Sequence, residues 1–278
     1  KKHKTMAVTM ADISKLRTMT GAGMMDCKNA LTEAEGNFDK AIEIIRKKGQ
    51  AIAAKRSDRQ AAEGCVLAAQ KDGFAAVVAL QCETDFVAQN ADFIALTQSI
   101  LDFAMANEIE SKEALLAAEL DGRSIADLIT DRSGITGEKM ELGFYEFVKG
   151  AATVAYIHPG NKLATIVTFN EAIDNQIARE IAMQVAAMNP IAVNRESVPA
   201  NIIEQELEIG REKARQEGKP EAMLDKIAQG RLNKFYSEST LLEQAFIKDA
   251  KVSVKDYLKQ QSANLTAVDF KRVTLNVD

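Results

Sequence analysis

The stretch that decides the fold runs Cys65-Val-Leu-Ala-Ala-Gln-Lys-Asp-Gly-Phe-Ala-Ala-Val-Val-Ala-Leu-Gln81. Two apolar runs flank Asp72-Gly73. Asp-Gly is a favoured pair for a type I′ turn, because both central residues of that turn need positive φ. The pattern therefore predicts a β-hairpin. A helix is expected next, because Asn90 is a favourable N-cap and apolar side chains then recur at helical spacing, at Phe93, Leu96, Ile100, Leu101 and Ala104. This order of elements indicates an α+β unit with a small antiparallel sheet.

The connection between the second strand and this helix contains Thr84-Asp85-Phe86-Val87. Such connections carry function more often than the elements that they join. The residues alone leave two interpretations open. In one, the Phe86 ring packs back on the helix as a hydrophobic staple, and Asp85 is a solvated turn residue. In the other, the turn presents both side chains to a partner.

A second copy of the strand, turn, strand and helix pattern is expected between residues 152 and 188. Its turn contains His158-Pro-Gly-Asn-Lys162, and its helix carries apolar residues at four-residue spacing, namely Ile173, Ile177, Ile181 and Val185. An extra strand, 141–148, precedes this copy, and the alternating run 268–275 is typical of an edge strand. We therefore expect an α+β core of two small subdomains, each an antiparallel sheet with helices on one side.

Helices are predicted before and after these strands. Residues 8–49 favour three short helices, of which the first begins with a capping box at Thr9 and the last ends at Gly49. Residues 51–63 are expected to form a helical linker. Two charged amphipathic helices flank Gly218-Lys219-Pro220, a pattern that predicts a protruding antiparallel helical hairpin.

These elements give an expected domain order. The N-terminal three-helix domain and its linker take residues 1–63. Core subdomain one takes 64–140 and core subdomain two takes 141–196. The helical hairpin is 197–237, and a C-terminal segment, 238–278, returns to core subdomain two.

Composition narrows the class of protein. The 278 residues carry a formal net charge of −5 and a sequence pI of about 5.4, whereas proteins that bind phosphates usually present a basic face. An RNA- or ribosome-binding protein is therefore disfavoured, and the acidic balance suggests a protein partner. An enzyme is disfavoured as well, because the chain has two histidines and lacks a P-loop, a G-x-G-x-x-G motif and a metal-spaced cluster.

The cysteines and the lengths of the apolar runs indicate the cellular compartment in which the protein is expected. The three cysteines, Cys27, Cys65 and Cys82, lack CxxC spacing and are expected to be buried thiols in a reducing compartment. No apolar run reaches membrane-spanning length, and no signal-peptide core follows the basic start. We expect a cytoplasmic protein that binds no membrane.

Three motifs together resemble the translation elongation factor Ts family. Besides Thr84-Asp85-Phe86-Val87, they are Thr20-Gly-Ala-Gly-Met-Met-Asp-Cys27 and Leu242-Glu-Gln-Ala-Phe-Ile-Lys-Asp249. They occur in the family's order, and the resemblance runs from about Ala7 to the C-terminus. Ala245 stands where many relatives have proline. The resemblance implies that the N-terminal helices form a ubiquitin-associated-like domain and that the hairpin is a coiled-coil protrusion, used for association in some members.

The resemblance also implies a function. The family consists of guanine nucleotide exchange factors for elongation factor Tu, so this chain would bind elongation factor Tu·GDP, disturb its Mg²⁺ and phosphate site and promote GDP release. It would not be an enzyme, and it would need no cofactor, no metal of its own and no direct nucleic-acid contact. Phe86 would be a wedge, Asp85 would disturb the groups around the partner's Mg²⁺, and Thr84 and Val87 would set the turn.

Four further residues are expected at the partner interface by the same resemblance. Arg17, Met24 and Met25 would form a second contact, and methionine suits an adaptable interface. Core packing is an alternative for both methionines, and it is favoured for Met24 over Met25, because Met24 shares a helix face with Cys27. His158 would be a contact too, although Asn161 replaces the family's commoner glycine. A homodimer through the helical hairpin is a further expectation.

Overall fold

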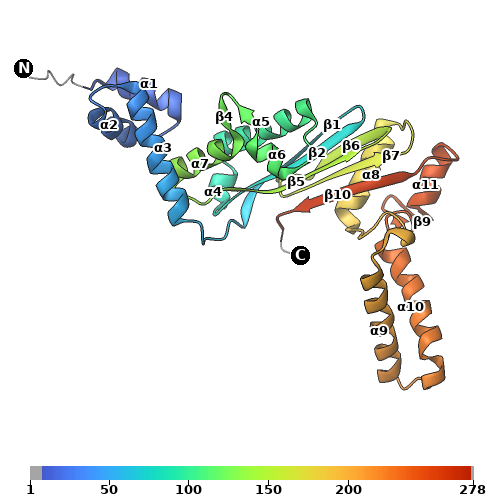
Figure 1. The fold of residues 1–278 in the computed structure, drawn as a ribbon. Helices are drawn as coiled ribbons and strands as arrows, with labels where there is room; N and C mark the ends of the chain where they lie inside the picture. The colour runs from blue at the N-terminus through green and yellow to red at the C-terminus, as the bar shows by residue number, and fades with distance from the viewer. Residues whose placement is uncertain (1–7, 277–278) are drawn as a thin grey trace, which may run out of the picture. The chain divides into compact units, whose positions relative to one another are not determined.

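The computed structural model describes residues 8–276, so the first seven residues of the predicted N-terminal domain lie outside the described part. The chain divides into two compact units. Unit one contains the described residues up to Cys65 together with Val78–Tyr145, and unit two contains Val66–Val77 and Glu146–Asn276. Helices and small antiparallel sheets occur together (Figure 1), which confirms the predicted α+β class. The finer domain boundaries stay a prediction.

Three N-terminal helices begin unit one, as predicted: α1 (Met10–Thr20), α2 (Met24–Glu33) and α3 (Phe38–Lys55). Thr9 and Asp12 form the capping box of α1. The helices enclose a small core of Ile13, Leu16, Ala22, Cys27, Ala30, Leu31, Ala34 and Ala41.

The predicted end of the third helix at Gly49 is wrong, since α3 continues to Lys55. The predicted helical linker 51–63 is helical only as far as Lys55. Gly49 is buried inside α3 and faces Gly134 of α7 (Ile125–Thr136); a Cβ added at Gly134 would lie 2.3 Å from the Gly49 Cα. Glycine at this point therefore serves a close approach of two helix backbones rather than a helix end.

The predicted hairpin is present as β1 (Glu63–Lys71) and β2 (Phe74–Cys82). The predicted type I′ turn is wrong, because Gly73 has a positive φ of 78° and Asp72 does not, whereas a type I′ turn needs it at both. The strand predicted at 141–148 is β5 (Glu141–Lys149), which pairs with β2 in a sheet of order β1-β2-β5. Every residue of β2 except Gln81 is buried. The elements that follow in unit one are α4 (Asp85–Ala88), α5 (Ala91–Asn107), α6 (Lys112–Ala117) and the short strands β3 (Glu119–Leu120) and β4 (Arg123–Ser124).

The predicted second copy of the pattern is present and lies in unit two. It consists of β6 (Ala152–Ile157), β7 (Leu163–Phe169) and α8 (Asn175–Met188), which packs against both strands (Figure 1). Ile173, predicted as part of its helix, lies before the helix begins. The strand order is β10-β7-β6, so β10 (Ala267–Thr274) is the edge strand that the alternating run predicted. Ile181, Val185, Val167 and Phe169 are among the fully buried residues of its core.

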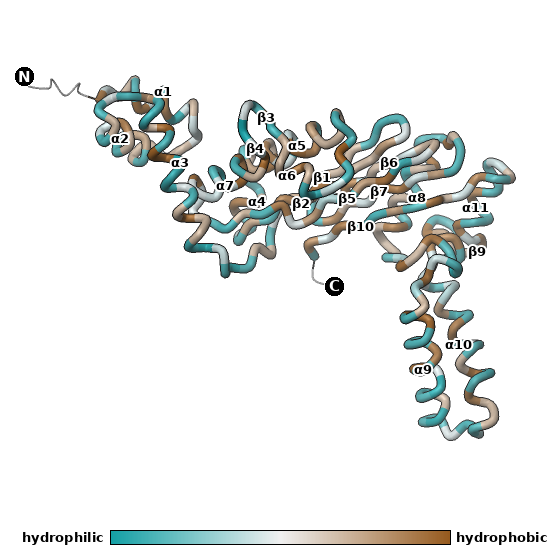
Figure 2. Tube along the Cα trace, in the orientation of Figure 1, coloured by the Kyte–Doolittle hydropathy of each residue, from teal (hydrophilic) through white to brown (hydrophobic). Residues whose placement is uncertain are grey.

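The helical hairpin is also present, formed by α9 (Ala200–Gln216) and α10 (Leu224–Ser239), with short 3-10 turns at η1 (Arg195–Ser197) and η2 (Glu221–Met223). Apolar and polar residues alternate along both helices (Figure 2), and Gly210 allows the backbone of Ala228 to approach closely. The sequence did not predict the elements that follow, β8 (Ala245–Phe246), β9 (Asp249–Ser253) and α11 (Val254–Gln261).

Candidate functional site

The motif Thr84-Asp85-Phe86-Val87 forms a single helical turn that the sequence did not predict. Thr84 has extended backbone angles and is the N-cap of α4, and its hydroxyl accepts a hydrogen bond from the Val87 N–H at 3.4 Å. The backbone N–H groups of Ala88 and Gln89 donate to the carbonyls of Thr84 and Asp85. Asn90 then caps α5, as predicted.

Phe86 points into solvent, with 85% of its surface exposed. Asp85 is exposed too, Val87 is half-buried, and Ala88 is the residue of the turn that packs inward. The staple interpretation of Phe86 is therefore wrong. A large aromatic ring usually buries most of its surface, so the exposed ring of Phe86 is available for contact with a partner.

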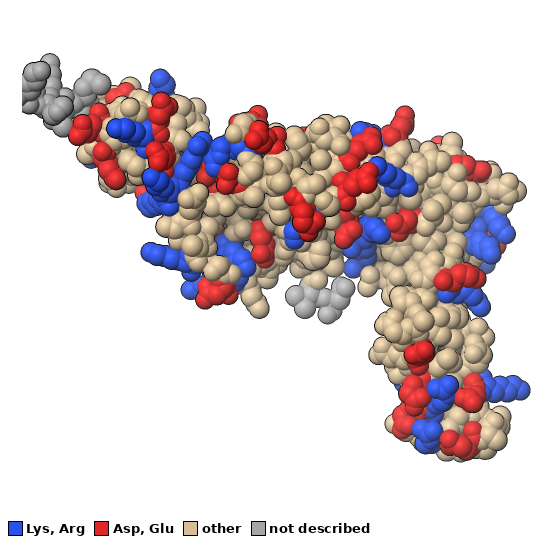
Figure 3. Space-filling view, viewed as in Figure 1, with Lys and Arg blue, Asp and Glu red and all other residues tan. Residues whose placement is uncertain are grey.

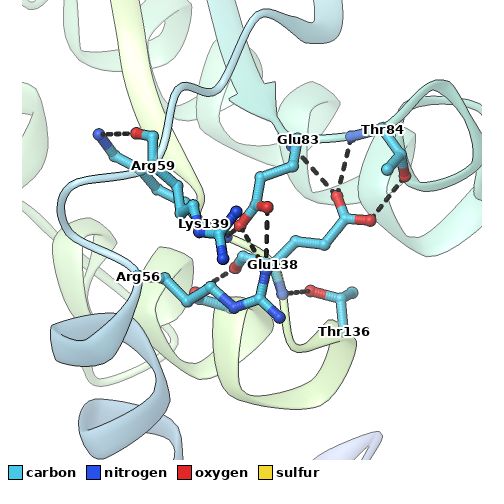
Figure 4. A network of polar contacts seen from close by, with 8 residues as sticks. Arg56, Arg59, Glu83, Thr84, Thr136, Glu138 and Lys139 are labelled. Carbon is cyan, nitrogen blue, oxygen red and sulfur yellow. Dashed lines mark hydrogen bonds and ion pairs between the residues drawn. The ribbon is translucent and has the colours of Figure 1, made fainter.

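The backbone of the motif is bound from below by Glu138, as Figure 4 shows. The Glu138 Oε2 accepts the backbone N–H of Glu83 at 3.1 Å and that of Thr84 at 3.0 Å, and Oε1 accepts the Thr84 hydroxyl at 2.6 Å. Hydrogen bonds to an ionised carboxylate are stronger than those between neutral groups. The sequence did not indicate Glu138, because nothing in the spacing of two residues 54 positions apart predicts their contact.

Glu83 belongs to the same network. Its carboxylate accepts the Lys139 backbone N–H at 2.6 Å and the Arg56 Nη1 at 2.9 and 3.1 Å (Figure 4). The Lys139 N–H, together with the Arg56 guanidinium, lowers the pKa of the Glu83 carboxyl. Arg56 is the residue after α3, and the Lys139 Nζ donates to the Arg59 carbonyl at 3.0 Å. The strand end at Glu83 is thus tied to the segment that leaves the N-terminal helices.

The second predicted contact lies on α1 and α2, where Arg17, Met24 and Met25 are all exposed. Met24 is 42% exposed and Met25 65% exposed, so the alternative that Met24 packs in the core is wrong. Met10 and Met19, which no sequence motif indicated, are also exposed on the three-helix domain. Methionine is flexible and polarizable, so each of these exposed side chains can adapt to a partner.

A cleft of about 1040 Å³ lies in unit one between the N-terminal helices and α5 and α7. Arg17 and Met19 line it, and so do the ion pairs Arg123–Asp131, at 2.7 Å, and Arg132–Asp92, at 3.6 Å. Side chains of both charge signs line the cleft.

His158, in unit two, is exposed in the β6–β7 turn, as the sequence indicated. Its Nδ1 shares a hydrogen bond of 2.9 Å with the Tyr156 hydroxyl. Asn161 accommodates a left-handed φ of 54° in the same turn, which asparagine tolerates better than most residues. The replacement of the family's glycine therefore leaves the turn intact.

Within residues 8–276, no three His, Cys, Asp or Glu side chains come together in a way that would bind a metal ion. All three cysteines are buried free thiols, as predicted. None of the helices in the described part is long and apolar enough to cross a membrane. On the face seen in Figure 3, Lys and Arg are interspersed with Asp and Glu, so that face offers no continuous basic surface for nucleic acid.

Comparisons with known proteins agree on one family. Residues 83–276 match the family described as Elongation factor TS. The chain is 66% identical over 274 residues to the Elongation factor Ts of Porphyromonas gingivalis, and 57% identical over 274 residues to that of Azobacteroides pseudotrichonymphae. It is 47% identical over 330 aligned positions to that of Bacteroides fragilis. Each of these alignments covers 98% of this chain and the whole of the relative.

Proposed function

Because the chain belongs to the elongation factor Ts family, and is thus an elongation factor of protein biosynthesis, we propose that it is a guanine nucleotide exchange factor. It binds elongation factor Tu·GDP, disturbs the Mg²⁺ and phosphate site of that partner and promotes GDP release, so that GTP rebinds. The chain itself makes and breaks no covalent bond, holds no metal, and acts in the cytoplasm.

The observation that carries this proposal is the exposed ring of Phe86 on a turn whose backbone is bound by Glu138. Burying one phenylalanine side chain stabilises a complex by about 1.5–3 kcal/mol. About 1.4 kcal/mol corresponds to a tenfold change in affinity. Insertion of this ring into the partner therefore accounts for about one to two powers of ten in affinity for the nucleotide-free partner. Any larger acceleration of GDP release has to come from other contacts.

Asp85 is proposed to weaken nucleotide binding in a second way, through the partner's Mg²⁺ site. Mg²⁺ requires near-ideal octahedral geometry and is bound together with substrate phosphates. A carboxylate brought close to the residues that order its water shell adds negative charge there and weakens the nucleotide site. By thermodynamic reciprocity, bound nucleotide weakens the binding of this chain by the same factor. GTP and GDP therefore compete with the factor, as a cycle of exchange requires.

Other surfaces complete the proposed complex. Arg17, Met24 and Met25 form a second contact, to which the exposed Met19 adds apolar area. His158 is a contact from unit two. The hairpin of α9 and α10 mediates association of two copies; Ile209 and Met223 are exposed on it. The proposed complex includes no direct nucleic-acid contact.

The test is release of a fluorescent GDP analogue from purified elongation factor Tu, with and without this chain. We expect release to accelerate in proportion to added protein and then to saturate as the complex fills. If the folded chain binds elongation factor Tu without accelerating release, it is a binding protein and the exchange function is wrong.

A further inference from the structure

Glu138 has a place in the structure that no motif assigns to it. It lies between α7 and β5, directly after Gly137, and its carboxylate accepts three hydrogen bonds from Glu83 and Thr84. These two residues immediately precede the exposed Asp85 and Phe86. One side chain thus binds the backbone from which both candidate contact residues project (Figure 4).

The backbone of Glu138 is itself fixed on both sides. Gly137 ends α7 with a φ of 74°, a left-handed conformation that glycine adopts at low cost. The Glu138 N–H donates to the Thr136 hydroxyl at 3.3 Å, and the Glu138 carbonyl accepts a hydrogen bond from the Ser133 hydroxyl. The Glu138 side chain therefore starts from a backbone position that is fixed directly after the end of α7.

The motif needs such support, because α4 has only four residues. One isolated turn of helix is unstable in water, since nucleation costs more than a few hydrogen bonds return. The Thr84 hydroxyl has one donor and two acceptor sites. Its hydrogen points to the Glu138 Oε1, which leaves its lone pairs for the Val87 N–H. Glu138 thus orients the cap of the turn and also binds the two backbone N–H groups that precede the turn, those of Glu83 and Thr84.

We propose that Glu138 is a positioning residue for nucleotide exchange. It fixes, before the partner binds, the direction in which the Asp85 and Phe86 side chains project from the protein surface. This inference rests on the proposed function. A turn ordered in advance does not have to be ordered on binding, so less of the interaction energy is lost. Glu138 touches neither nucleotide nor partner in this role.

Three substitutions of Glu138 distinguish the effect of its side-chain geometry from the effect of its charge and from a loss of folding. Glu138→Gln keeps the length: its oxygen accepts the two N–H groups, and its amide donates to a rotated Thr84 hydroxyl. Glu138→Asp keeps the charge but is about 1.5 Å shorter. Glu138→Ala removes both. We expect the maximum rate of GDP release to stay within about threefold of wild type for Gln and to fall about tenfold for Asp and Ala.

The matched control is Glu180→Ala in unit two. Glu180 also accepts three hydrogen bonds, from Lys248 and Tyr257 at 2.6 Å and from Gln176 at 3.1 Å. Its loss is expected to lower the melting temperature without changing the maximum exchange rate. A role of Glu138 in general stability alone would make the two alanine variants alike in exchange.

A second measurement does not depend on the partner. Amide hydrogen exchange of Val87, Ala88 and Gln89 in the free chain reports the order of the turn. We expect faster exchange at these amides in Glu138→Asp and Glu138→Ala, and unchanged exchange in Glu138→Gln and Glu180→Ala. If wild type fails to accelerate GDP release, the proposed function is wrong, while these amides still decide whether Glu138 orders the turn.

Three results would overturn the inference. One is unchanged amide exchange in the Asp variant. Another is the reverse order of activities, with Asp near wild type and Gln impaired, which would mean that the charge acts and not the geometry. The third is faster amide exchange with an undiminished maximum release rate. If Glu138→Ala does not fold, the Gln and Asp pair decides, since both keep a side chain that fills the site.

Discussion

The two strand-to-helix connections of the repeated pattern differ in what they do with a large apolar side chain. Residues 83–90 connect β2 to α5 and leave Phe86 85% exposed. Residues 170–174 connect β7 to α8, and there Ile173 packs against the core of unit two. The same order of elements thus produces a presented ring in one copy and a packed side chain in the other.

Polar contacts to distant parts of the chain explain the difference. In the first connection, Glu138 binds the backbone of Glu83 and Thr84, and the extra turn α4 turns the next side chains outward. In the second, Asn170 donates to the Asn264 carbonyl and accepts the Thr266 N–H, both at 2.8 Å, with no extra turn before α8. Whether a connection buries its apolar residue therefore depends on partners that local sequence does not identify.

The largest effect is expected from Phe86→Ala. We expect the rate of GDP release from elongation factor Tu to fall about ten- to a hundredfold, because the partner loses the burial of one ring. The free energy of unfolding should change by less than about 0.5 kcal/mol, because an exposed side chain contributes little to the fold. Stopped-flow release and urea unfolding measure the two quantities.

Phe144→Ala is the control for this change. Phe144 is another exposed phenylalanine of unit one, 42% exposed on β5. Its removal should leave the release rate at the wild-type value. Equal losses in both variants would mean that general surface hydrophobicity, and not the position of Phe86, speeds exchange.

Ile173→Ala is expected to have the opposite effects to Phe86→Ala, with a loss of stability and no loss of exchange. Its side chain is half-buried against the core of unit two, so we expect a loss of about 1–2 kcal/mol in the free energy of unfolding, less than the cost for a fully buried isoleucine. The maximum release rate should not change while the protein stays folded. An Ile173→Ala variant as stable as wild type would show that the second connection does not depend on its apolar residue.

The sequence predicted the elements on which this comparison depends. Asp72-Gly73 has no good alternative to a tight turn, and the periodic apolar residues of α5 and α8 bury one face, so local pattern and tertiary structure agree. The same holds for the capping box of α1 and for the edge strand β10.

The sequence failed where a residue's partner lies far along the chain. Gly49 resembles a helix end, yet it is a contact with Gly134, 85 residues later, and α3 continues past it. Met24 shares a helical periodicity with the buried Cys27, yet 42% of its surface is exposed. Glu138 carries no motif at all. The burial of Phe86 was undecidable for the same reason, since its direction depends on Glu138.

The smallest predicted effect concerns pH and the Glu83 carboxylate of the first connection. Hydrogen bonding to Lys139 N–H and pairing with Arg56 lower the pKa of Glu83 below its usual 4.5. A carboxyl whose pKa is lower in the folded state contributes stability above its unfolded pKa, and that contribution disappears as the pH falls through the folded value.

Wild type should therefore be more stable than Glu83→Gln at pH 7, and the difference should shrink below about pH 4.5. Urea unfolding of both proteins from pH 7 to pH 3 measures it, and a difference that stays constant over this range would show that the ionised form of Glu83 does not stabilise the connection. The bonds of Asn170 involve amide and backbone groups, which do not titrate, so Asn170→Ala should cost the same stability across the range.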